Sequence, residues 1–280
     1  MNGICWILNQ LPINIKLGEF KRGRSPLFTL KGRRAGIDKI GVGWDNNTCA
    51  NKTGRQPHLK KVLFCWSGGK DSALALHEIQ ENNNYQVVSL LTTITEDYDR
   101  ISMHGVRRLL VEQQAQSLDI PLHKVFIPRS CSNEEYGAKM SQALNKFKQD
   151  SVETVAFGDI FLEEVRKYRE GNLAKLNMKG IFPLWGRNSA ELVRSFVALG
   201  FKAVVSCIDT KVLDKKFLGR QLDKDFIAEL PPDIDPSGEN GEFHSFVYDG
   251  PIFKEKIGYK RGESVLRDSF YFCDLIPTGH

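Results

Sequence analysis

The sequence predicts an α/β fold in which helices cover both faces of a doubly wound parallel sheet, followed by a smaller C-terminal α+β region. Three observations predict it. Short apolar runs alternate with helical segments from residue 62 onward, a glycine-rich turn follows the first run, and the alternation stops beyond Asp209. Parallel strands need helical crossovers, and a sheet covered on both faces has strands that are apolar throughout. At 280 residues, 41% of them apolar, the chain is long enough to bury such a core.

Five apolar runs have the length of buried strands. They span residues 62–66, 86–94, 123–127, 154–157 and 203–207. Five segments with helical spacing lie between them, at 72–79, 106–118, 134–147, 161–176 and 190–199, the last two both before the run 203–207. Beyond Pro231-Pro232 the last fifty residues are typical of strands and turns. We therefore expect a tail over 1–60, an α/β domain over 61–212 and a C-terminal region over 213–280.

The first sixty residues differ from the rest in charge. Residues 1–61 hold twelve Lys or Arg against three acidic residues, a net charge of +9, so the other 219 residues carry 27 basic and 31 acidic side chains, a net charge of −4. No helical or strand period is sustained in this segment. Three interpretations stay open: a disordered basic arm, a transit peptide with Ser25 as its only serine, and a non-native extension translated from upstream of the true start. We favour the last, because the expected domain starts abruptly at Lys60, and we assign the segment no function.

Composition excludes several classes of protein. No stretch approaches the roughly 18–20 uninterrupted apolar residues of a membrane-spanning helix. The six cysteines include no C-x-x-C pair, which argues against a structural zinc or iron–sulfur site. Cys65 and Cys207 lie inside apolar runs and are typical of reduced core thiols, so we expect a cytoplasmic protein. The mildly acidic body argues against nucleic acid as a partner.

The most informative motif separates the first expected strand from the first expected helix. It reads Ser67-Gly68-Gly69-Lys70-Asp71-Ser72. In a doubly wound sheet, anionic ligands bind at the carboxyl ends of the strands. Two glycines permit a tight turn that brings backbone N–H groups against phosphate oxygens, and the next helix adds its positive N-terminal end. The serine hydroxyls can donate hydrogen bonds and the lysine can neutralise charge, so the motif predicts a nucleotide-binding loop.

Asp71 distinguishes two interpretations of this loop. In the structural alternative, Gly-Gly only makes the turn and Ser or Asp caps the helix. A carboxylate beside a polyphosphate would repel it unless Mg²⁺ bridges the two, so Asp71 instead predicts a metal-bridged nucleotide. The loop is not a Walker A motif, because Asp71 stands where that motif needs Ser or Thr.

In its strand-to-helix context, the hexapeptide resembles the PP-loop ATP pyrophosphatases, which carry S-G-G-x-D-S after their first strand. The resemblance implies an adenine nucleotide alpha-hydrolase-like fold for residues 61–212, with ATP and Mg²⁺ as ligands. It also implies cleavage of ATP between the α and β phosphates and adenylation of a carbonyl or carboxylate oxygen. The loop would then grip the departing pyrophosphate.

Two later strand ends carry further candidate residues. The fourth expected strand ends in Gly158-Asp159-Ile160, and Asp159 either contributes to nucleotide or metal binding or caps the following helix. Trp185 and Arg187 belong to the sequence F-P-L-W-G-R, which precedes another helix. The Trp185 ring either packs in the core or forms the floor of a ligand pocket.

A second glycine-rich segment over 235–245 reads D-P-S-G-E-N-G-E-F-H-S, and we call it the Gly-rich cassette. Glycines on both sides of Glu239-Asn240 indicate a turn with positive φ or a close approach by another group. Because side chains alternate along a strand, Glu242 and His244 would share one face of the strand that follows. This pair is either part of a polar site or the exposed face of a hairpin.

With G-D-I and P-L-W-G, the cassette resembles the diphthine–ammonia ligase family and its bacterial relatives, over essentially all of residues 61–280. In that family the eukaryotic and archaeal members amidate diphthine, the modified histidine of elongation factor 2, through an acyl-adenylate that ammonia attacks. The form E-N-G-E-F-H-S, followed by V-Y-D-G-P-I-F, is more similar to the bacterial branch. Bacteria lack diphthamide, which implies another acceptor. Ser237 and Ser245 depart from the Cys and Thr of the family pattern.

The resemblance implies an ATP-dependent, AMP-forming amide ligase. Its acceptor would be a modified-histidine protein side chain or a small carboxylate, and free ammonia would supply nitrogen, since no glutaminase domain is evident. The implied ATP–Mg²⁺ ligands are Ser67, Gly68, Gly69, Lys70, Asp71, Ser72 and Asp159, with Asp71 as the metal ligand. The implied substrate-binding residues are Trp185, Arg187, Glu239, Asn240, Gly241, Glu242 and His244. The expected catalytic residues are Asp71, Glu242 and His244.

Two other functions stay open. A PP-loop tRNA-modifying enzyme would share the loop, although the acidic body and the unpaired cysteines argue against it. A nucleotide-binding sensor would use the loop without turnover. An adenylating enzyme must bring the acceptor oxygen in line with the departing pyrophosphate. We therefore expect Glu239–His244 to face Ser67–Ser72 across one cleft at the carboxyl edge of the sheet.

Overall fold

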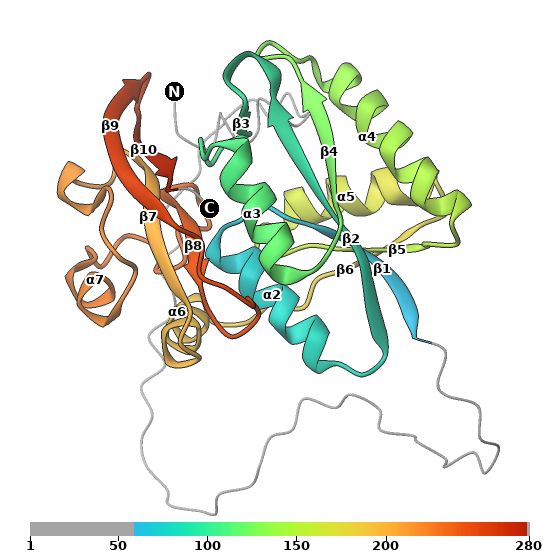
Figure 1. Ribbon diagram of the computed structural model, residues 1–280, viewed down its shortest axis with the longest axis horizontal. Helices are drawn as coiled ribbons and strands as arrows, with labels where there is room; N and C mark the ends of the chain where they lie inside the picture. Colours follow the sequence, from blue (N-terminus) through green and yellow to red (C-terminus); the bar gives the residue numbers. More distant parts are fainter. Residues whose placement is uncertain (1–58, 279–280) are drawn as a thin grey trace, which may run out of the picture. The chain divides into compact units, whose positions relative to one another are not determined.

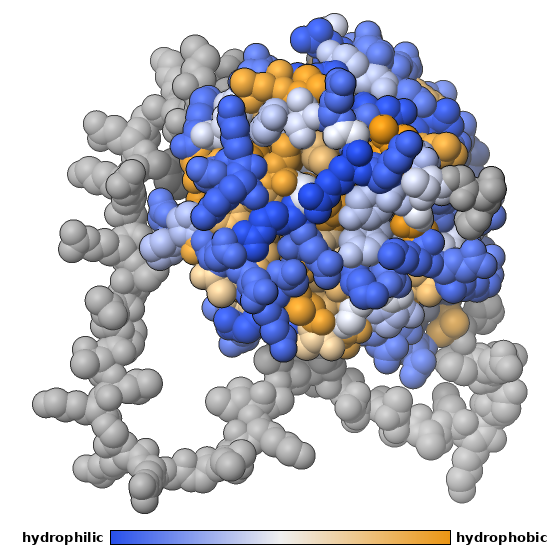
Figure 2. All heavy atoms as spheres, turned by 60° about the vertical axis from the view of Figure 1, so that its left-hand side comes forward, coloured by the Kyte–Doolittle hydropathy of each residue, from blue (hydrophilic) through white to orange (hydrophobic). Residues whose placement is uncertain are grey.

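The computed structural model describes residues 59–278. The expectations for the tail over 1–60 therefore concern residues that lie, apart from the last two, outside the described range. Within that range no helix combines the length and apolar character that crossing a bilayer would need. Figure 2 shows the face on the side of the C-terminal sheet, where hydrophilic side chains predominate and apolar ones form small patches between them.

The N-terminal part of the described chain forms a sheet of five parallel strands. They are β1 (Lys60–Cys65), β2 (Tyr85–Thr95), β4 (Leu122–Ile127), β5 (Thr154–Ala156) and β6 (Lys179–Ile181). Their order is β4-β2-β1-β5-β6, and the two-residue strand β3 (Arg100–Ile101) pairs antiparallel with the end of β2. The predicted doubly wound parallel sheet is therefore confirmed (Figure 1).

Helices cover both faces of this sheet. They are α2 (Lys70–Glu81), α3 (Arg108–Leu118), α4 (Asn133–Gln149) and α5 (Glu163–Lys175), and one 3₁₀ turn, η1 (Glu96–Tyr98), follows β2. In β1, Val62 and Phe64 belong to a buried cluster with residues of α2 and α3, whereas Leu63 belongs to a second cluster with residues of α4 and α5. Because successive strand residues point to opposite faces, each face packs against its own pair of helices.

A second sheet of four antiparallel strands follows. Its strands are β7 (Lys202–Asp209), β8 (Phe243–Asp249), β9 (Tyr259–Arg267) and β10 (Phe270–Pro277), in the order β8-β7-β10-β9. Three short helical elements belong to this region, namely α6 (Ser189–Ala198), η2 (Lys215–Phe217) and α7 (Lys224–Glu229). The expected α+β character of the C-terminal part is therefore confirmed.

One strand assignment from the sequence is wrong. The run 203–207, expected as the fifth parallel strand, lies in β7 and pairs antiparallel with β8 and β10. The fifth parallel strand is instead β6, a three-residue K-G-I segment that is too short to show a pattern. A short apolar run reveals burial but not the direction of its partners, which explains the error. As a result β7 lies before the predicted boundary at residue 212 but pairs with strands beyond it.

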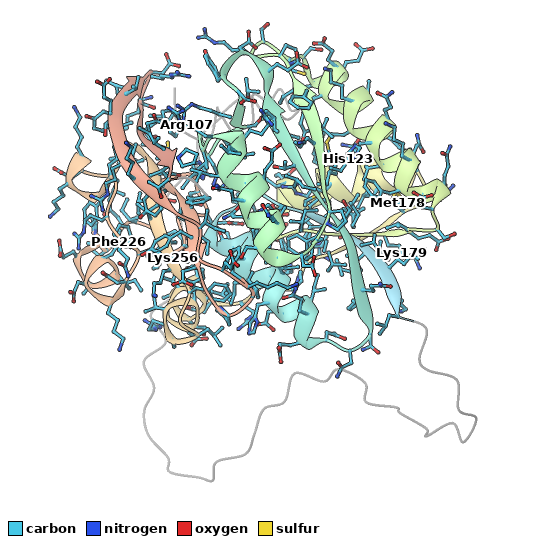
Figure 3. All side chains as sticks on the ribbon, in the orientation of Figure 1. Arg107, His123, Met178, Lys179, Phe226 and Lys256 are labelled. Carbon is cyan, nitrogen blue, oxygen red and sulfur yellow. The ribbon has the colours of Figure 1, made fainter. Side chains whose placement is uncertain are left out.

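The two sheets share one hydrophobic core. The cluster that covers α2 and α3 continues through Val204 of β7 and Phe246 of β8. At the edge of this core, Asp274 of β10 forms ion pairs of 2.8 Å with Arg100 and 2.7 Å with Arg107, at the start of α3 (Figure 3). The C-terminal sheet is therefore held against the helices that follow β1 and β2.

The strand order determines where a ligand can bind. The chain leaves β1 toward β2 on one side, while β5 lies on the other side, so the connections diverge between β1 and β5. Open α/β sheets bind ligands in the crevice at the carboxyl ends of such strands. The loops that begin at Ser67 and at Gly158 both lie there.

Candidate active site

The loop after β1 is closed by its own backbone and two serines. Gly68 has a φ of +79°, in the left-handed region that favours glycine. The hydroxyl of Ser67 accepts a hydrogen bond from the Gly69 N–H at 3.3 Å and donates to Ser72 Oγ at 3.1 Å, and Ser72 Oγ donates to the Gly69 carbonyl at 2.9 Å. Helix α2 starts after Gly69 without a side-chain cap, so neither serine nor Asp71 caps it. No side chain of the loop therefore caps the helix, and a helix N-terminus at this place favours an anion.

Gln114 of α3 attaches this loop to the second sheet. Its buried amide donates to the carbonyls of Gly68 at 3.0 Å and Val247 at 2.6 Å, and its oxygen accepts from Trp66 Nε1 at 2.9 Å. The Val247 N–H in turn donates to the Gly68 carbonyl at 2.9 Å. We call residues 67–72 the phosphate loop, after the ligand that the sequence predicts for them. Because every polar group of the buried Gln114 amide has a partner, the phosphate loop and β8 are held as one unit.

Gly158 lies against the first turn of α2. A Cβ atom at this position would be 3.0 Å from the Asp71 carbonyl carbon and 3.0 Å from the Ser72 nitrogen. Both are backbone atoms and cannot move aside cheaply. The glycine of the G-D-I sequence therefore permits the loop after β5 to contact the loop after β1.

The Gly-rich cassette is built around two carboxylates. Asp235 Oδ2 accepts hydrogen bonds from the N–H groups of Ser237 at 3.2 Å and Glu239 at 3.0 Å. Glu242 Oε1 accepts from the Asp235 N–H at 3.1 Å and from the Asn240 side chain at 3.0 Å. The second oxygen of Glu242, Oε2, is buried and has no hydrogen-bond partner within the described part of the chain. Glu242 therefore stabilises the turn of its own loop.

The glycines of the cassette behave as the sequence predicts. Gly238 and Gly241 have φ values of +62° and +89°, and a Cβ on Gly238 would be 2.7 Å from the Phe243 carbonyl oxygen. Positive φ and close approach are thus both confirmed for Gly238. The turn directs Glu239 away from the loop, where its carboxylate accepts a 2.8 Å hydrogen bond from the Ile160 N–H.

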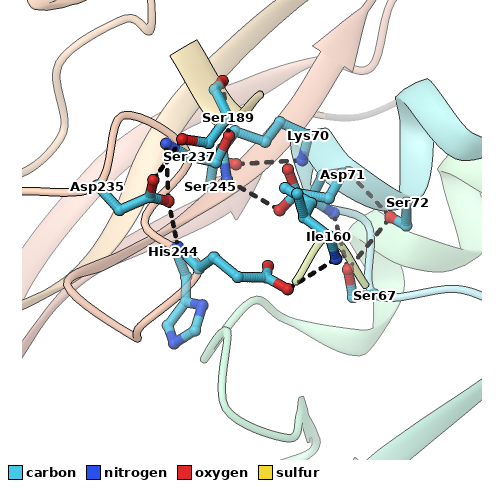
Figure 4. A network of polar contacts seen from close by, with 12 residues as sticks. Ser67, Lys70, Asp71, Ser72, Ile160, Ser189, Asp235, Ser237, His244 and Ser245 are labelled. Carbon is cyan, nitrogen blue, oxygen red and sulfur yellow. Dashed lines mark hydrogen bonds and ion pairs between the residues drawn. The ribbon is translucent and has the colours of Figure 1, made fainter. Parts of the chain in front are cut away.

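One pocket of about 270 Å³ contains residues from both glycine-rich segments. From the sequence-predicted set, Ser67, Lys70, Asp71, Ser72, Asp159, Glu239 and His244 line it. A further link is the hydrogen bond of 3.2 Å from the Lys70 N–H to Ser245 Oγ (Figure 4). The prediction that the cassette faces the phosphate loop across one cleft is therefore confirmed.

Five predicted substrate-binding residues do not line this pocket. Asn240 and Glu242 bond to each other within the cassette, and Arg187 pairs with Glu78 of α2 at 2.7 Å. Trp185 stacks with Arg166 of α5, with 4.6 Å from the guanidinium to the ring centroid. Gly241, also expected at the site, contributes its positive φ to the turn rather than to the pocket lining. Direct substrate contacts by these residues stay predictions.

Charged groups are concentrated at the pocket wall beside α2. Lys70 Nζ lies 2.9 Å from Asp71 Oδ2, and the lysine side chain is 5% exposed while the aspartate is 29% exposed. Desolvation raises the pKa of the Asp71 carboxyl against the effect of Lys70, and Asp235 and Asp159 add to the rise. Burial likewise raises the pKa of Glu239 to about 8, and the Asp71 charge contributes. The carboxylates thus repel one another and favour a cation or a proton between them.

Asp159 has a partner that the sequence did not reveal. Arg169 of α5 forms an ion pair with it at 2.9 Å and lies over the Phe157 ring at 4.5 Å from the centroid. Both charged residues line the pocket. Asp159 therefore orients an arginine toward the ligand space.

A second histidine also lines the pocket. His104, between β3 and α3, contacts His244, with ring centroids 4.8 Å apart and the ring planes tilted by 39°. Burial lowers the pKa of His104 to about 4, and burial together with His104 and Lys70 lowers the pKa of His244 well below its usual value. Both imidazoles are therefore neutral near pH 7.

The residues that sequence reasoning missed are Gln114, His104 and Arg169. Gln114 looks like any polar residue of an amphipathic helix, and His104 lies in a short loop without a repeat. Arg169 was visible only as one charge on a charged helix. Their partners lie between 10 and 141 residues away, so local patterns carried no signal for them.

The donor set fits Mg²⁺ as a partner of bound phosphate rather than as an ion held by protein alone. Among residues 59–278, no group of three or more His, Cys, Asp or Glu is placed to hold a metal. Asp71 nevertheless offers a partly exposed carboxylate whose raised pKa reflects desolvation and neighbouring acids. Mg²⁺ usually binds through one or two carboxylates, waters and substrate phosphates. An anion-binding helix end beside such a carboxylate can therefore hold a metal–polyphosphate and a second reactant in one pocket.

Two family models match the chain in tandem. The model described as the diphthamide synthase N-terminal domain matches residues 60–179, and the diphthamide synthase C-terminal domain matches residues 188–276. The gap between the two matches precedes α6, and the C-terminal match includes the antiparallel sheet except for the last residue of β10.

Curated relatives show the same likeness at low identity. The chain is 25% identical over 238 residues to a diphthine–ammonia ligase of Mus musculus and 26% identical over 238 residues to that of Homo sapiens, covering 77% of this chain and 88% of each relative. It is 26% identical over 234 residues to a diphthine–ammonia ligase of Schizosaccharomyces pombe, where the match covers 77% of this chain but only 38% of the relative.

Proposed function

The chain belongs to the diphthamide synthase family, and from this premise we propose that it is an ATP-dependent ligase that forms an amide. In this reaction the enzyme adenylates an acceptor carboxylate, releases pyrophosphate, and lets ammonia displace AMP. The observation that carries the proposal is the single pocket with the phosphate loop on one wall and the Gly-rich cassette on the other. The adenylation step of such a ligase needs ATP and the acceptor side by side.

The phosphate loop would bind the polyphosphate of ATP. The N-terminal end of α2 supplies a positive backbone dipole, and Ser67 and Ser72 already order the turn through hydrogen bonds. Lys70 is buried beside the pocket, so its charge is poorly screened and acts strongly on a phosphate. These groups would stabilise the charge that develops on departing pyrophosphate.

Asp71 would hold Mg²⁺ together with phosphate oxygens and water. When bound, the ion would neutralise the polyphosphate and so relieve the repulsion between the nucleotide and the carboxylates. Lys70, now paired with Asp71 at 2.9 Å, would then be released toward the phosphates. Asp159 would orient Arg169 toward the same space through their ion pair.

The acceptor would enter beside Glu239 and His244. Glu239 accepts a hydrogen bond from the Ile160 N–H, which holds the Gly-rich cassette against the loop after β5. By their names, the mouse and human relatives act on diphthine and ammonia. For this chain we propose ATP and ammonia as substrates, with a modified-histidine side chain or a small carboxylate as acceptor.

Pyrophosphate and AMP production tests the proposal. The full chain is incubated with MgATP and ammonium chloride, with either diphthine-bearing elongation factor 2 or a panel of small carboxylates. We expect pyrophosphate release that depends on the acceptor and an amide that depends on ammonia. Lys70→Ala should abolish release, whereas Lys175→Ala, on the exposed end of α5, should not.

Each other result contradicts the proposal in a specific way. MgATP binding without pyrophosphate release under every condition would favour a nucleotide sensor. Pyrophosphate release that requires tRNA, and no carboxylate, would favour a tRNA-modifying enzyme. Release of ADP and phosphate would exclude adenylation altogether.

A further inference from the structure

The two neighbouring imidazoles of His104 and His244 come from segments 140 residues apart and meet inside the pocket. His104 follows β3, whereas His244 is the second residue of β8. Their ring centroids are 4.8 Å apart with an angle of 39° between the planes, and both rings line the pocket beside the phosphate loop. Two imidazole rings with basic nitrogens at a reaction site indicate a role in proton transfer.

The hydrogen bonding of His104 indicates which nitrogen carries its proton. Nδ1 lies 3.2 Å from the carbonyl oxygen of Ser245. A carbonyl can only accept, so Nδ1 is the protonated nitrogen and Nε2 keeps a free lone pair. The same serine receives the Lys70 N–H on its hydroxyl, which connects His104 to the first residue of α2 through one residue.

The backbone holds both histidines in register. Ser206 of β7 is 1% exposed, and its hydroxyl lies 3.2 Å from the His104 carbonyl and 3.4 Å from the His244 carbonyl. A single buried donor thus faces both residues. Ser206 therefore helps to fix the backbones of His104 and His244 relative to each other.

His104 also lies directly on the phosphate loop. A Cβ atom on Gly69 would be 2.7 Å from Cε1 of the His104 ring. The next ring atom is Nδ1, 3.3 Å from the same position, so the Nδ1–Cε1 edge of the imidazole lies against the loop. Gly69 therefore makes room for this imidazole, in addition to forming the turn.

The charges around the pair keep it neutral before substrates bind. Burial and the charge of Lys70 lower the pKa of His104 against the opposite effect of its hydrogen bond to Ser245, and burial, His104 and Lys70 lower the pKa of His244. Asp71 and Glu239 face the same pocket, and Asp71 is already paired with Lys70. A nucleotide that neutralises Lys70 would make the imidazoles more basic at the moment when a proton is released.

We propose that His104 and His244 form the proton acceptor for the amide-forming step, an inference that rests on the proposed ligase function. The lone pair of ammonia attacks the acyl carbon of the adenylate and forms the C–N bond. The bond from that carbon to the AMP oxygen breaks, and its electron pair leaves with AMP. One N–H proton passes to an imidazole nitrogen of the pair and then to water. The pair holds one proton at a time, because two cations this close repel each other.

Substitution of His104 separates proton transfer from structure. The side chain of His104→Asn can retain a donor toward the Ser245 carbonyl but has no basic nitrogen. We expect the affinity for MgATP and the amplitude of the first-turnover burst of pyrophosphate to be unchanged. The rate of amide formation should fall on the order of 10²-fold. His244→Gln should behave in the same way, and His123→Asn, on β4 and outside the pocket (Figure 3), should match the unaltered chain.

Three outcomes of this experiment would overturn the inference. Unchanged amide formation in both pocket variants would show that no base is needed there. Loss of the pyrophosphate burst in His104→Asn would assign the residue to structure or to adenylation. Absence of the burst in the unaltered chain, with every acceptor, would overturn the proposed function and the proton step with it.

An acceptor-free measurement tests the protonation state itself. In a chain labelled with ¹⁵N-histidine, NMR should show both imidazoles neutral at pH 7, and His104 protonated at Nδ1 with an unprotonated Nε2. Assignment comes from the loss of signals in the same variants. A charged imidazole at pH 7 in either residue, or a proton on Nε2 of His104, would contradict the inference whatever the reaction proves to be.

Discussion

Glu239 accepts a 2.8 Å hydrogen bond from the backbone N–H of Ile160. This contact joins the Gly-rich cassette to the loop after β5, and that loop touches the start of α2 through Gly158. Two segments far apart in the sequence thereby form one wall of a pocket. The relationship leads to predictions for stability, nucleotide binding and pH dependence.

Gly158→Ala should disturb the contact between the two loops. The new Cβ would lie 3.0 Å from the Asp71 carbonyl carbon and 3.1 Å from its oxygen, so backbone has to move. Overpacking of this kind costs about 1–3 kcal/mol of unfolding free energy, and MgATP affinity should fall because α2 shifts. Urea unfolding and MgATP titration measure both effects.

Gly171→Ala in α5 is the matched control, since nothing lies within 4 Å of its added Cβ. Replacing an exposed helix glycine by alanine should stabilise the fold by about 0.5–1 kcal/mol. If Gly158→Ala were as harmless as this control, the close approach would not matter.

Asp71→Asn should weaken the binding of MgATP far more than it alters folding. The carboxamide cannot supply the charge that Mg²⁺ needs, so the Kd for MgATP should rise on the order of tenfold or more, about 1.4 kcal/mol. Affinity for ATP without Mg²⁺ should change little or improve, because a repulsive carboxylate is removed. Calorimetric titration with and without Mg²⁺ gives the comparison.

Asp233→Asn, at an exposed position after the Pro-Pro pair, serves as the control for Asp71→Asn. It should leave both affinities unchanged. Equal Mg²⁺-dependent affinity in Asp71→Asn and the unaltered chain would remove Asp71 from the metal site.

Glu239→Gln should change how stability depends on pH. Burial and the Asp71 charge raise the pKa of Glu239 to about 8 in the folded protein. Between its usual pKa and this value the folded state binds more protons than the unfolded state, so the stability of the unaltered chain falls as pH rises through that window. Glutamine does not titrate and keeps an oxygen for the Ile160 N–H, so the variant should gain stability relative to the unaltered chain from pH 5 to pH 8.5.

Unfolding free energies of both proteins at these two pH values, without nucleotide, measure the difference. A constant difference across the range would show that Glu239 is ionised normally. A difference of opposite sign would mean that its carboxylate is stabilised in the fold.

Gln114→Leu should loosen the phosphate loop from β8. Leucine leaves the buried Trp66 N–H and the Gly68 and Val247 carbonyls with fewer hydrogen-bond partners. A buried polar group that loses its partner lowers the free energy of unfolding by about 1–3 kcal/mol. Thermal unfolding should therefore occur at a lower temperature and MgATP affinity should fall. Gln116→Leu, exposed on the same helix, should do neither. Equal behaviour of the two variants would contradict the structural role of Gln114.

Local sequence predicted the parts of the site that are built locally. The phosphate loop lies between β1 and α2 as expected, because two glycines, a preceding apolar run and a following helical segment act within a few residues. Positive φ at Gly238 and Gly241 was equally visible, since glycine spacing reflects backbone conformation.

Other features required knowledge of strand pairing. The run 203–207 showed that it is buried, but a parallel and an antiparallel neighbour bury it equally well. Likewise Glu242 was expected beside His244 on a strand face, yet β8 begins only at Phe243, and the Glu242 carboxylate is used to close the turn. Its position one residue before the strand removed the alternation on which the expectation rested.

The sequence by itself determined the fold class, the loop between β1 and α2 and the glycine-rich turn of the cassette, because these depend on short-range conformation and on the pattern of apolar residues. Only the tertiary structure decided which side chains share the pocket. His104 meets His244, Gln114 meets Gly68 and Val247, and Glu239 meets Ile160 through contacts between distant segments. Such contacts follow from how two sheets pack on one core, and no local period along the chain records them.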